Sequence, residues 1–402
     1  MSMPRTTRRA VLTGMAAAPF VLSRGAFAQG TKQPIRVGST LALTGPLGQT
    51  AAIHKIAAEV AVEHINKNGG WLGRPVEHIL YDDQSQAGVT RTLYEKLISI
   101  DKVDLVIGPY ATAGILAAMA VAQRYGKVLV QPSLGIPSMS TYDMMFGSSP
   151  WGPDPATHLA ELVFDAVASV GAAPKSVAIM TSKFPSSQFY AKAAQAVAEK
   201  RGISVAVYLE YEFGTRDFTA IAGRIKDANA DMIYGGTLGV EPVLFLEAAK
   251  KLDYVPKRQF YFAPALGPVG ELPEADRAMT IAYIDETLPY TNYKGAKDFI
   301  KDFGEKAKAA NLPYPHVEAQ AGSQYAQWQI LTAGIEGAKS LDDKAIADWL
   351  KKNDVDDVFG KVNFRAQYNT STNDLLKVGQ LQDKKWVTVW SKEFAVPGYA
   401  VK

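Results

Sequence analysis

The chain has 402 residues, a formal net charge of +3 at pH 7 and no cysteine. The lack of cysteine excludes disulfides, thiol catalysis, thiolate metal sites and a membrane anchor attached through a lipid-modified cysteine. A chain of this length exceeds one typical hydrophobic core, so two domains are expected.

Residues 1–28 have the pattern of an export signal. A basic start that includes Arg8 and Arg9 precedes an apolar run over 10–22, and the small-x-small sequence at 26–28 is typical of a cleavage site. The two adjacent arginines favour the twin-arginine route, although a general secretory signal can also contain such a pair. We therefore expect a periplasmic protein.

Cleavage of this signal changes the charge of the chain. The segment holds four arginines and no acid, so the net charge falls from +3 to −1. No basic stripe remains to indicate a nucleic-acid partner. No later segment has the roughly 18 uninterrupted apolar residues of a membrane span. The mature protein is expected to be a free monomer.

Strand and helix patterns alternate along most of the chain. In chain order, the first series predicts a strand at 35–43, a helix at 51–66, a strand at 76–81, a helix at 89–100, a strand at 104–107, a helix from about 113 and a strand at 127–130. The second series predicts a helix at 155–170, a strand at 176–180, a helix at 188–201, a strand at 203–211, a helix at 218–228, a strand at 231–234, a helix at 243–252 and a strand at 260–262.

The last third departs from this alternation. It predicts a strand at 278–285, helices at 296–310, 318–339 and 344–352, and a hairpin at 377–390. Alternating strands and helices imply parallel sheets with helices on both faces. The fold class is therefore α/β, with two doubly wound, Rossmann-like lobes and a chain that crosses between them more than once.

The sequence lacks the motifs of common catalytic sites. It contains no G-x-S-x-G, G-x-G-x-x-G, G-x-x-x-x-G-K-[ST] or H-E-x-x-H pattern, and no two of its five histidines have metal-binding spacing. Asp82-Asp83 could form an acid pair, but such acids more often cap a turn. We expect no enzymatic activity, no metal and no cofactor. An exported hydrolase is the least favoured alternative.

Several predicted strands end in small or hydroxyl-bearing residues. In open α/β sheets, ligands bind outside the carboxyl ends of the strands. The clearest example is Gly108 to Thr112, which joins a buried strand to a helix. The start of a helix offers unpaired N–H groups to an anion, and Thr112 adds a hydroxyl. Taken alone, however, Thr112 is more simply interpreted as the N-cap of the helix.

Several segments together resemble one protein family. They are IRVGSTLALTGPLG, AVEHINKNGGWLGRPVEHILYDDQS, DLVIGPYATAG, VLVQPS, RDFTAIAGRIKDANADMIYGG and FGKVNFRAQYN. From about Ile35 to its end, the chain resembles the branched-chain amino acid (leucine/isoleucine/valine) type of periplasmic solute-binding protein. The resemblance implies the type I binding-protein fold, with three crossovers and a central ligand cleft. It further implies hinge closure on the ligand and delivery to an ABC permease.

The same resemblance implies the extent of each lobe. The first lobe would comprise residues 31–153 and 288–377, and the second would comprise 154–287 and 378–402. A sensory binding protein of the same fold is an alternative, because transport and sensing both present the closed form to a membrane partner. A neighbouring permease gene, or loss of uptake on deletion, would separate the two.

The resemblance also implies where the ligand carboxylate binds. In the amino-acid receptors, a hydroxyl and backbone N–H groups after the third strand hold it, which corresponds to Thr112 with Ala111 beside it. This changes the preferred interpretation of Thr112 from helix cap to ligand contact. The next loop corresponds to Ser133, Leu134 and Gly135, and Gly135 departs from the threonine that the family commonly carries.

In the second lobe, the departures affect the site for the ammonium group. Ala265 stands in place of the family's acid, and Thr237 replaces an aromatic residue. Ser186 aligns with a second aromatic residue, although Phe184 lies two positions earlier. A desolvated ammonium group needs a carboxylate. The carboxylate end of the site is therefore predicted to be kept and the ammonium end lost.

The expected ligand is a small aromatic or other apolar carboxylate without an α-amino group. Tyr110, Trp151 and Phe184 are predicted to form flat apolar walls around it. Each residue also has a purely structural interpretation: Tyr110 as a surface residue, Trp151 as a residue that packs in the hinge, and Phe184 as a core residue.

Branched-chain or other amino acid binding remains the main alternative for the ligand. It would require a carboxylate from another loop, such as Asp154, Glu212 or Glu241.

Overall fold

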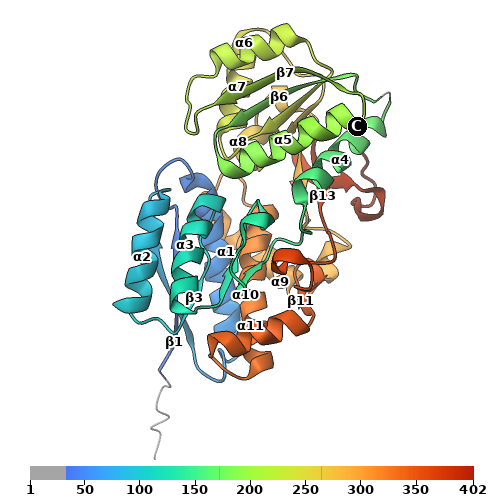
Figure 1. Cartoon of the computed structure of the whole chain (residues 1–402). Helices are drawn as coiled ribbons and strands as arrows, with labels where there is room; N and C mark the ends of the chain where they lie inside the picture. Colours follow the sequence, from blue (N-terminus) through green and yellow to red (C-terminus); the bar gives the residue numbers. More distant parts are fainter. Residues whose placement is uncertain (1–32, 172, 264) are drawn as a thin grey trace, which may run out of the picture. The chain divides into compact units, whose positions relative to one another are not determined.

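A computed structural model describes residues 33–402 of the chain, apart from 172 and 264. The predicted export signal therefore lies outside the described residues. The first sheet is parallel, with the strand order β2-β1-β3-β4-β5 (Figure 1). Its strands are β1 (Ile35–Leu41), β2 (Val76–Asp82), β3 (Leu105–Ile107), β4 (Leu129–Gln131) and β5 (Met145–Gly147).

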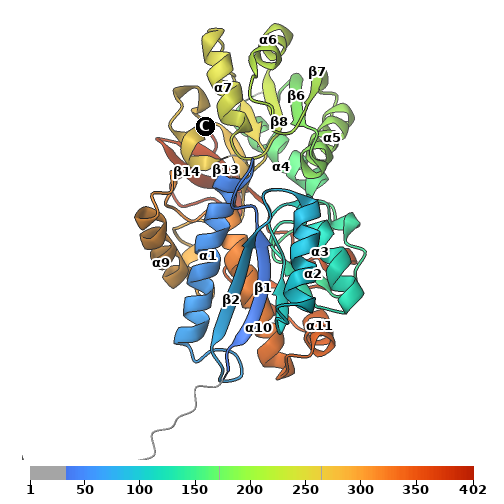
Figure 2. The same ribbon diagram turned by 90° about the vertical axis from the view of Figure 1, so that its left-hand side faces the viewer.

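The helices of this sheet cover both of its faces. They are α1 (Gly48–Lys67), α2 (Ala87–Ser99), α3 (Thr112–Tyr125), α9 (Ala296–Ala309), α10 (Ala319–Ala338) and α11 (Asp343–Lys352). Val106 and Leu129 share an apolar core with α2 and α3, whereas Ile107 and Val130 share one with α1 and α10. Side chains alternate along a strand, so each strand supports both cores. Figure 2 shows α1 and α2 flanking β1 and β2.

The second sheet has the order β14-β13-β10-β9-β8-β6-β7. Its strands are β6 (Ser176–Ser182), β7 (Ser204–Tyr211), β8 (Met232–Gly236), β9 (Gln259–Tyr261), β10 (Met279–Ala282), β13 (Lys377–Gln382) and β14 (Lys385–Trp390), and its helices are α4 (Pro155–Ala168), α5 (Pro185–Lys200), α6 (Thr219–Ala228), α7 (Glu241–Lys251) and α8 (Leu266–Gly270). The first five strands in chain order run parallel, and β13 and β14 add an antiparallel pair.

The predicted C-terminal hairpin is present as β13 and β14. Its turn residues Asp383 and Lys384 have φ values of 50° and 62°. Two positive φ values in succession match the tight turn that suits the twist of a hairpin. The short strand β5 and the short helix α8 were not predicted, because three and five residues carry too little periodicity.

The strand predicted at 278–285 ends earlier, at Ala282. Asp285 leaves the ladder, and its carboxylate accepts hydrogen bonds from the backbone N–H groups of Thr287 and Thr388. The chain passes between the sheets here, and also between β5 and α4 and before β13. The short pair β11 (Val355–Asp357) and β12 (Gly360–Val362) precedes this last passage.

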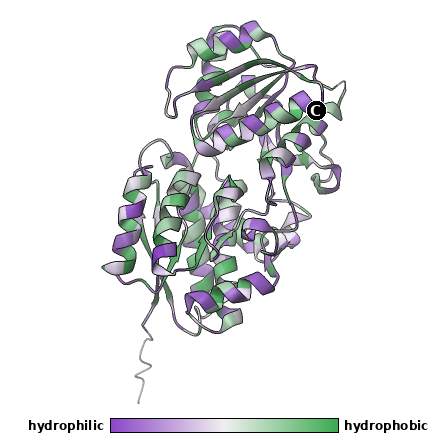
Figure 3. Ribbon diagram, viewed as in Figure 1, coloured by the Kyte–Doolittle hydropathy of each residue, from purple (hydrophilic) through white to green (hydrophobic). Residues whose placement is uncertain are grey.

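The predicted fold class is confirmed, with parallel α/β sheets in two lobes. The exact lobe boundaries stay a prediction. Figure 3 shows hydrophilic and hydrophobic residues alternating along outer helices such as α6 and α11. Among the described residues, no helix is both long enough and apolar enough to cross a membrane.

Candidate functional site

The turn between β3 and α3 holds an unusual backbone. Ala111, which is the N-cap of α3, has φ 68° and ψ 145°. This conformation is close to a region that essentially only glycine occupies, and such strain concentrates at functional sites. The backbone N–H of Ala111 donates to Oγ of Ser133 at 3.2 Å. The turns after β3 and β4 are thus joined directly.

Thr112 is the first residue of α3 and does not cap it, so the interpretation of Thr112 as the N-cap is wrong. Its Oγ1 instead accepts a hydrogen bond from the backbone N–H of Gly135 at 3.3 Å. The hydroxyl proton of Thr112 is therefore available to another acceptor. The side chain is almost fully buried, so a hydroxyl proton without an acceptor there costs desolvation free energy.

Three backbone N–H groups at the start of α3 remain unsatisfied. Within the described part of the chain, those of Thr112, Ala113 and Gly114 donate to no acceptor. The start of a helix also carries partial positive charge. Together, these groups form a place for an anion.

A cavity opens beside this helix start, and we call it the central cavity. Its empty volume is ≈ 410 Å³, which includes space open to solvent. It is lined by Tyr110, Ala111, Thr112, Ser133, Gly135, Trp151, Phe184, Ser186, Leu238, Phe262, Ala263, Ile281, Tyr283 and Gln320. Loops after strands of both sheets contribute. No charged side chain is among the described residues that line it.

Eight of the eleven predicted site residues line the central cavity, and three do not. Leu134 packs into the apolar core beneath α2 and α3. Thr237 is fully buried and donates its hydroxyl to the carbonyl of Phe262 at 3.1 Å. Ala265 lines a neighbouring cavity instead. These three residues are therefore not direct contacts of the central cavity.

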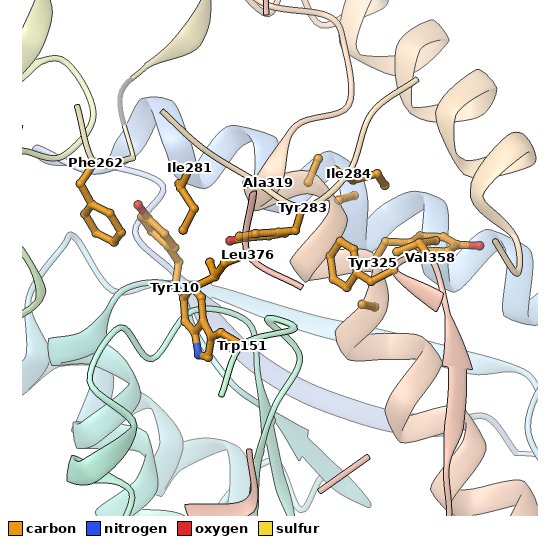
Figure 4. Close-up of a cluster of buried hydrophobic side chains, with 14 of the residues drawn as sticks. Tyr110, Trp151, Phe262, Ile281, Tyr283, Ile284, Ala319, Tyr325, Val358 and Leu376 are labelled. Atoms are coloured by element: carbon orange, nitrogen blue, oxygen red, sulfur yellow. The ribbon is translucent and has the colours of Figure 1, made fainter. Parts of the chain in front are cut away.

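Aromatic rings form much of the wall. The rings of Trp151 and Tyr283 meet edge to face with centroids 6.1 Å apart, and Tyr110 lies 4.4 Å from the ring of His54. In Figure 4, the hydroxyl oxygens of Tyr110 and Tyr283 appear on either side of Ile281. Burial raises the pKa of Tyr283 to about 12 and that of Tyr110 further, so both phenols stay neutral at pH 7.

The sequence analysis missed six lining residues, namely Leu238, Phe262, Ala263, Ile281, Tyr283 and Gln320. Phe262 directly follows β9 and Leu238 stands two residues after β8, so the rule of strand ends could have found both. Ile281 and Tyr283 stand near the chain passage after β10. Gln320 comes from α10, and no local signal connects that helix to the cavity.

The acids considered as substitutes for Ala265 do not line the central cavity. Asp154 caps α4 by accepting from Thr157 N–H, and Glu212 forms an exposed ion pair with Lys183 at 2.5 Å. Glu241 is buried and accepts from the backbone N–H of Leu238 at 2.9 Å.

Glu318 is an acid beside the central cavity. It lines the neighbouring cavity of ≈ 600 Å³, which shares Ala263, Ile281 and Gln320 with the central one. Its carboxylate caps α10 by accepting from the backbone N–H groups of Gln320 and Ala321. Burial raises the pKa of Glu318 to about 7. Sequence reasoning did not single out this residue.

The Asp82-Asp83 pair caps turns, as predicted. Asp82 accepts from the hydroxyl of Thr44 at 2.7 Å and from the N–H of Gln84 at 2.8 Å. Asp83 accepts from the hydroxyl of Thr40 at 2.7 Å. Among the described residues, no group of three or more His, Asp or Glu side chains could hold a metal ion.

Comparison with known proteins identifies related chains. The model of a family described as periplasmic binding protein matches residues 34–385. A leucine-, isoleucine-, valine-, threonine- and alanine-binding protein from Pseudomonas aeruginosa is 25% identical over 342 residues, which cover 82% of this chain and 85% of the relative.

Solved structures with the same fold include proteins with different ligands. A leucine binding protein from Thermotoga maritima has a TM-score of 0.74 at 20% identity, covering 88% of this chain and 97% of the other. An ABC transporter solute-binding protein from R. palustris, in complex with benzoate, has a TM-score of 0.72 at 17% identity, covering 89% of this chain and 95% of the other.

Proposed function

Because the chain belongs to the periplasmic binding protein family, we propose that it captures a small aromatic or other apolar carboxylate without an α-amino group and delivers it to a membrane ABC permease. The family match confirms the resemblance found in the sequence. Members of the family bind solutes for transport and are not enzymes, which supports a binding role. In this proposal, the two lobes close by a hinge around the central cavity.

One observation carries the proposed ligand class. The central cavity offers the hydroxyl of Thr112 and three N–H groups without an acceptor, yet none of the described residues that line it has a charged side chain. A carboxylate therefore finds donors there, whereas an ammonium group would lose its water without gaining a counter-charge. The rings of Tyr110, Trp151 and Phe184 would enclose the apolar part of the ligand.

The ligands of the structural neighbours agree with this chemistry. Leucine and benzoate both carry a carboxylate, but only leucine carries an ammonium group. Benzoate is thus the example of a ligand that needs no acid in the site. The neighbours share the fold at low identity, so the ligand assignment rests on the cavity itself.

Amino acid binding is the second candidate, and Glu318 is the observation that favours it. Its carboxylate lies in the cavity next to the central one, beside the shared residue Gln320. The ammonium group of an α-amino acid stands on the carbon next to its carboxylate, so Glu318 would pair with it only if the ligand lies at the wall that the two cavities share. The protein would act in the periplasm in either case, and export by the twin-arginine route stays a prediction.

A thermal-shift panel on the purified mature protein tests the proposal. The panel contains benzoate, hydroxybenzoates, phenylpropanoates, keto acids, aliphatic carboxylates and the branched-chain amino acids. A ligand at 100 times its dissociation constant adds about 2.7 kcal/mol to the unfolding free energy. We expect aromatic acids to raise the melting temperature and amino acids to leave it unchanged. A largest shift with leucine would reject the proposed ligand class in favour of amino acid binding.

A further inference from the structure

The buried amides of Gln327 and Gln324 form a hydrogen-bond network in which the direction of each bond is fixed. The network starts at Gln327, whose Nε2 donates to the backbone carbonyls of Gly108 and Val130 at 3.0 and 2.7 Å. Carbonyl oxygens only accept, so this amide has one orientation. Its Oε1 must then accept, and it does so from Nε2 of Gln324 at 2.7 Å. The orientation of Gln324 is thereby fixed as well.

The fixed orientation of Gln324 determines the tautomer of His54. Oε1 of Gln324 lies 2.9 Å from Nδ1 of His54, and an amide oxygen can only accept. Nδ1 therefore carries a proton. His54 is fully buried, and no carboxylate forms an ion pair with it in the described part of the chain. Burial lowers the pKa of its imidazole to about 4, so the ring is neutral at pH 7. Nε2 is then a bare acceptor.

This acceptor in turn orients the side chain of Gln320. In the structure, Oε1 of Gln320 lies 3.2 Å from Nε2 of His54. Only its NH₂ group can bond to a bare nitrogen, and a half-turn of the amide about its terminal bond brings that group into place. The amide oxygen then occupies the other position. That position has no hydrogen-bond partner in the described chain, and Gln320 lines both the central cavity and the neighbouring one.

We propose that Gln320 presents its amide oxygen to the central cavity and selects a ligand that carries a hydroxyl group besides its carboxylate. The proposal rests on the proposed function, since it assumes that the central cavity holds the ligand. Gln320 is half-buried, and a ligand that covers its amide oxygen without donating to it leaves the acceptor with a desolvation penalty, so an acid lacking the hydroxyl binds more weakly. Gln320 is a specificity residue, and His54 positions it. The favoured class is a hydroxylated aromatic carboxylate.

Side-chain NMR tests the orientation without any ligand. Long-range ¹H–¹⁵N spectra of the uniformly labelled mature protein distinguish a protonated ring nitrogen from a bare one. We expect His54 to show a protonated Nδ1 and a bare Nε2 between pH 5.5 and 8, with its signals assigned by their loss in His54→Asn. A protonated Nε2 at these pH values would overturn the inference, because Gln320 would then turn its NH₂ group toward the cavity.

Calorimetric titration tests the selectivity. The probes are benzoate, 3- and 4-hydroxybenzoate, and the corresponding methoxybenzoates, whose ether oxygen can only accept. At least one hydroxybenzoate should bind about tenfold more tightly than its methoxy counterpart and than benzoate. Gln320→Met should reduce this preference to within about twofold. Gln329→Met, on the same helix but outside the cavity, should retain it.

The two possible failures are distinguishable. If benzoate binds and no hydroxybenzoate is preferred, or if Gln320→Met keeps the preference, this inference fails while the proposed function stands. If none of these acids binds but leucine does, the proposed ligand class fails and this inference fails with it.

Discussion

Thr112 is the residue whose side chain most directly tests carboxylate binding. Its hydroxyl already accepts from Gly135, so its proton is free to donate to the ligand. Thr112→Val keeps the shape and removes both the donor to the ligand and the acceptor of the Gly135 N–H. We expect the affinity for the strongest acid in the thermal-shift panel to fall by about 1.5–3 kcal/mol, as for a hydrogen bond to a charged group. Calorimetric titration measures the loss.

Thr112→Ser is the matched control, because it restores the hydroxyl without the methyl group. It should bind within a few-fold of the natural protein. Equal affinity of the valine variant and the natural protein would mean that the backbone N–H groups alone hold the ligand. The melting temperature of each variant without ligand separates a binding defect from a folding defect.

Ala111 provides a stability test at the same turn. Its backbone, at φ 68° and ψ 145°, is costly for any residue with a Cβ atom. Ala111→Gly relieves this strain, while the added freedom of the unfolded chain offsets part of the gain. We expect the free energy of unfolding in urea to rise by about 1 kcal/mol. A decrease would show that the surrounding contacts of the Ala111 methyl group outweigh the strain.

The residues of the site differ in how well the sequence could predict them. Thr112 and Ser133 follow strand ends, where the parallel fold gathers loops, so the pattern and the family resemblance both pointed to them. Gln320 and Tyr283 reach the cavity from a distant helix and from a passage between the sheets. Only tertiary packing brings them there. The N-cap interpretation of Thr112 failed because the chain holds Ala111 in a conformation that propensities disfavour.

At the scale of elements, β13 begins with a buried lysine. Lys377 is 1% exposed, and its Nζ donates to the carbonyl of Leu375 at 2.7 Å. The ammonium group lies 4.5 Å from the ring centroid of Phe394 and 5.6 Å from that of Tyr290. Burial lowers the pKa of Lys377 from 10.5 to about 7. Lys377 therefore binds a proton less tightly in the folded protein than in the unfolded chain.

This shift sets the sign of a pH effect on stability. Between pH 7 and 10.5, the unfolded state binds one more proton at Lys377 than the folded state. The free energy of unfolding of the natural protein therefore rises with pH in this range. Lys377→Met removes the proton uptake. The free energy of unfolding of Lys377→Met minus that of the natural protein should fall by about 1.4 kcal/mol for each unit of rising pH across the middle of this window.

Urea denaturation of both proteins between pH 7.5 and 9.5 measures that difference. Lys385→Met, at an exposed position on the paired strand β14, is the control and should give a difference independent of pH. A pH-independent difference for Lys377→Met as well would show that Lys377 keeps an ordinary pKa in the folded protein.

The elements themselves followed the sequence where the periodicity was long. The alternating strands and helices of both sheets, and the hairpin around Asp383 and Lys384, were predictable from the periodicity of apolar residues and from turn residues. The three-residue strand β5 was not, because so short a segment has no measurable period. The predicted strand at 278–285 was too long, because the apolar residues Tyr283 and Ile284 are buried outside the sheet ladder.

At the scale of the whole molecule, one close contact connects the two sheets at the central cavity. Gly135 belongs to the loop after β4, and Ser186 stands in the first turn of α5 beside the second sheet. A Cβ atom added at Gly135 would lie 2.8 Å from Cβ of Ser186. A side chain at position 135 would therefore collide with α5 as the two sheets are placed here.

Gly135→Ala therefore tests whether ligand binding requires the two lobes to close. Overpacking of this kind costs about 1–3 kcal/mol, which should weaken acid binding by roughly ten- to hundredfold. Small-angle X-ray scattering with saturating ligand should show a larger radius of gyration than for the natural protein. The double variant Gly135→Ala/Ser186→Gly removes the opposing Cβ atom and should recover most of the affinity. If the double variant binds as weakly as Gly135→Ala, the lost affinity arises within the loop after β4 rather than from the meeting of the lobes.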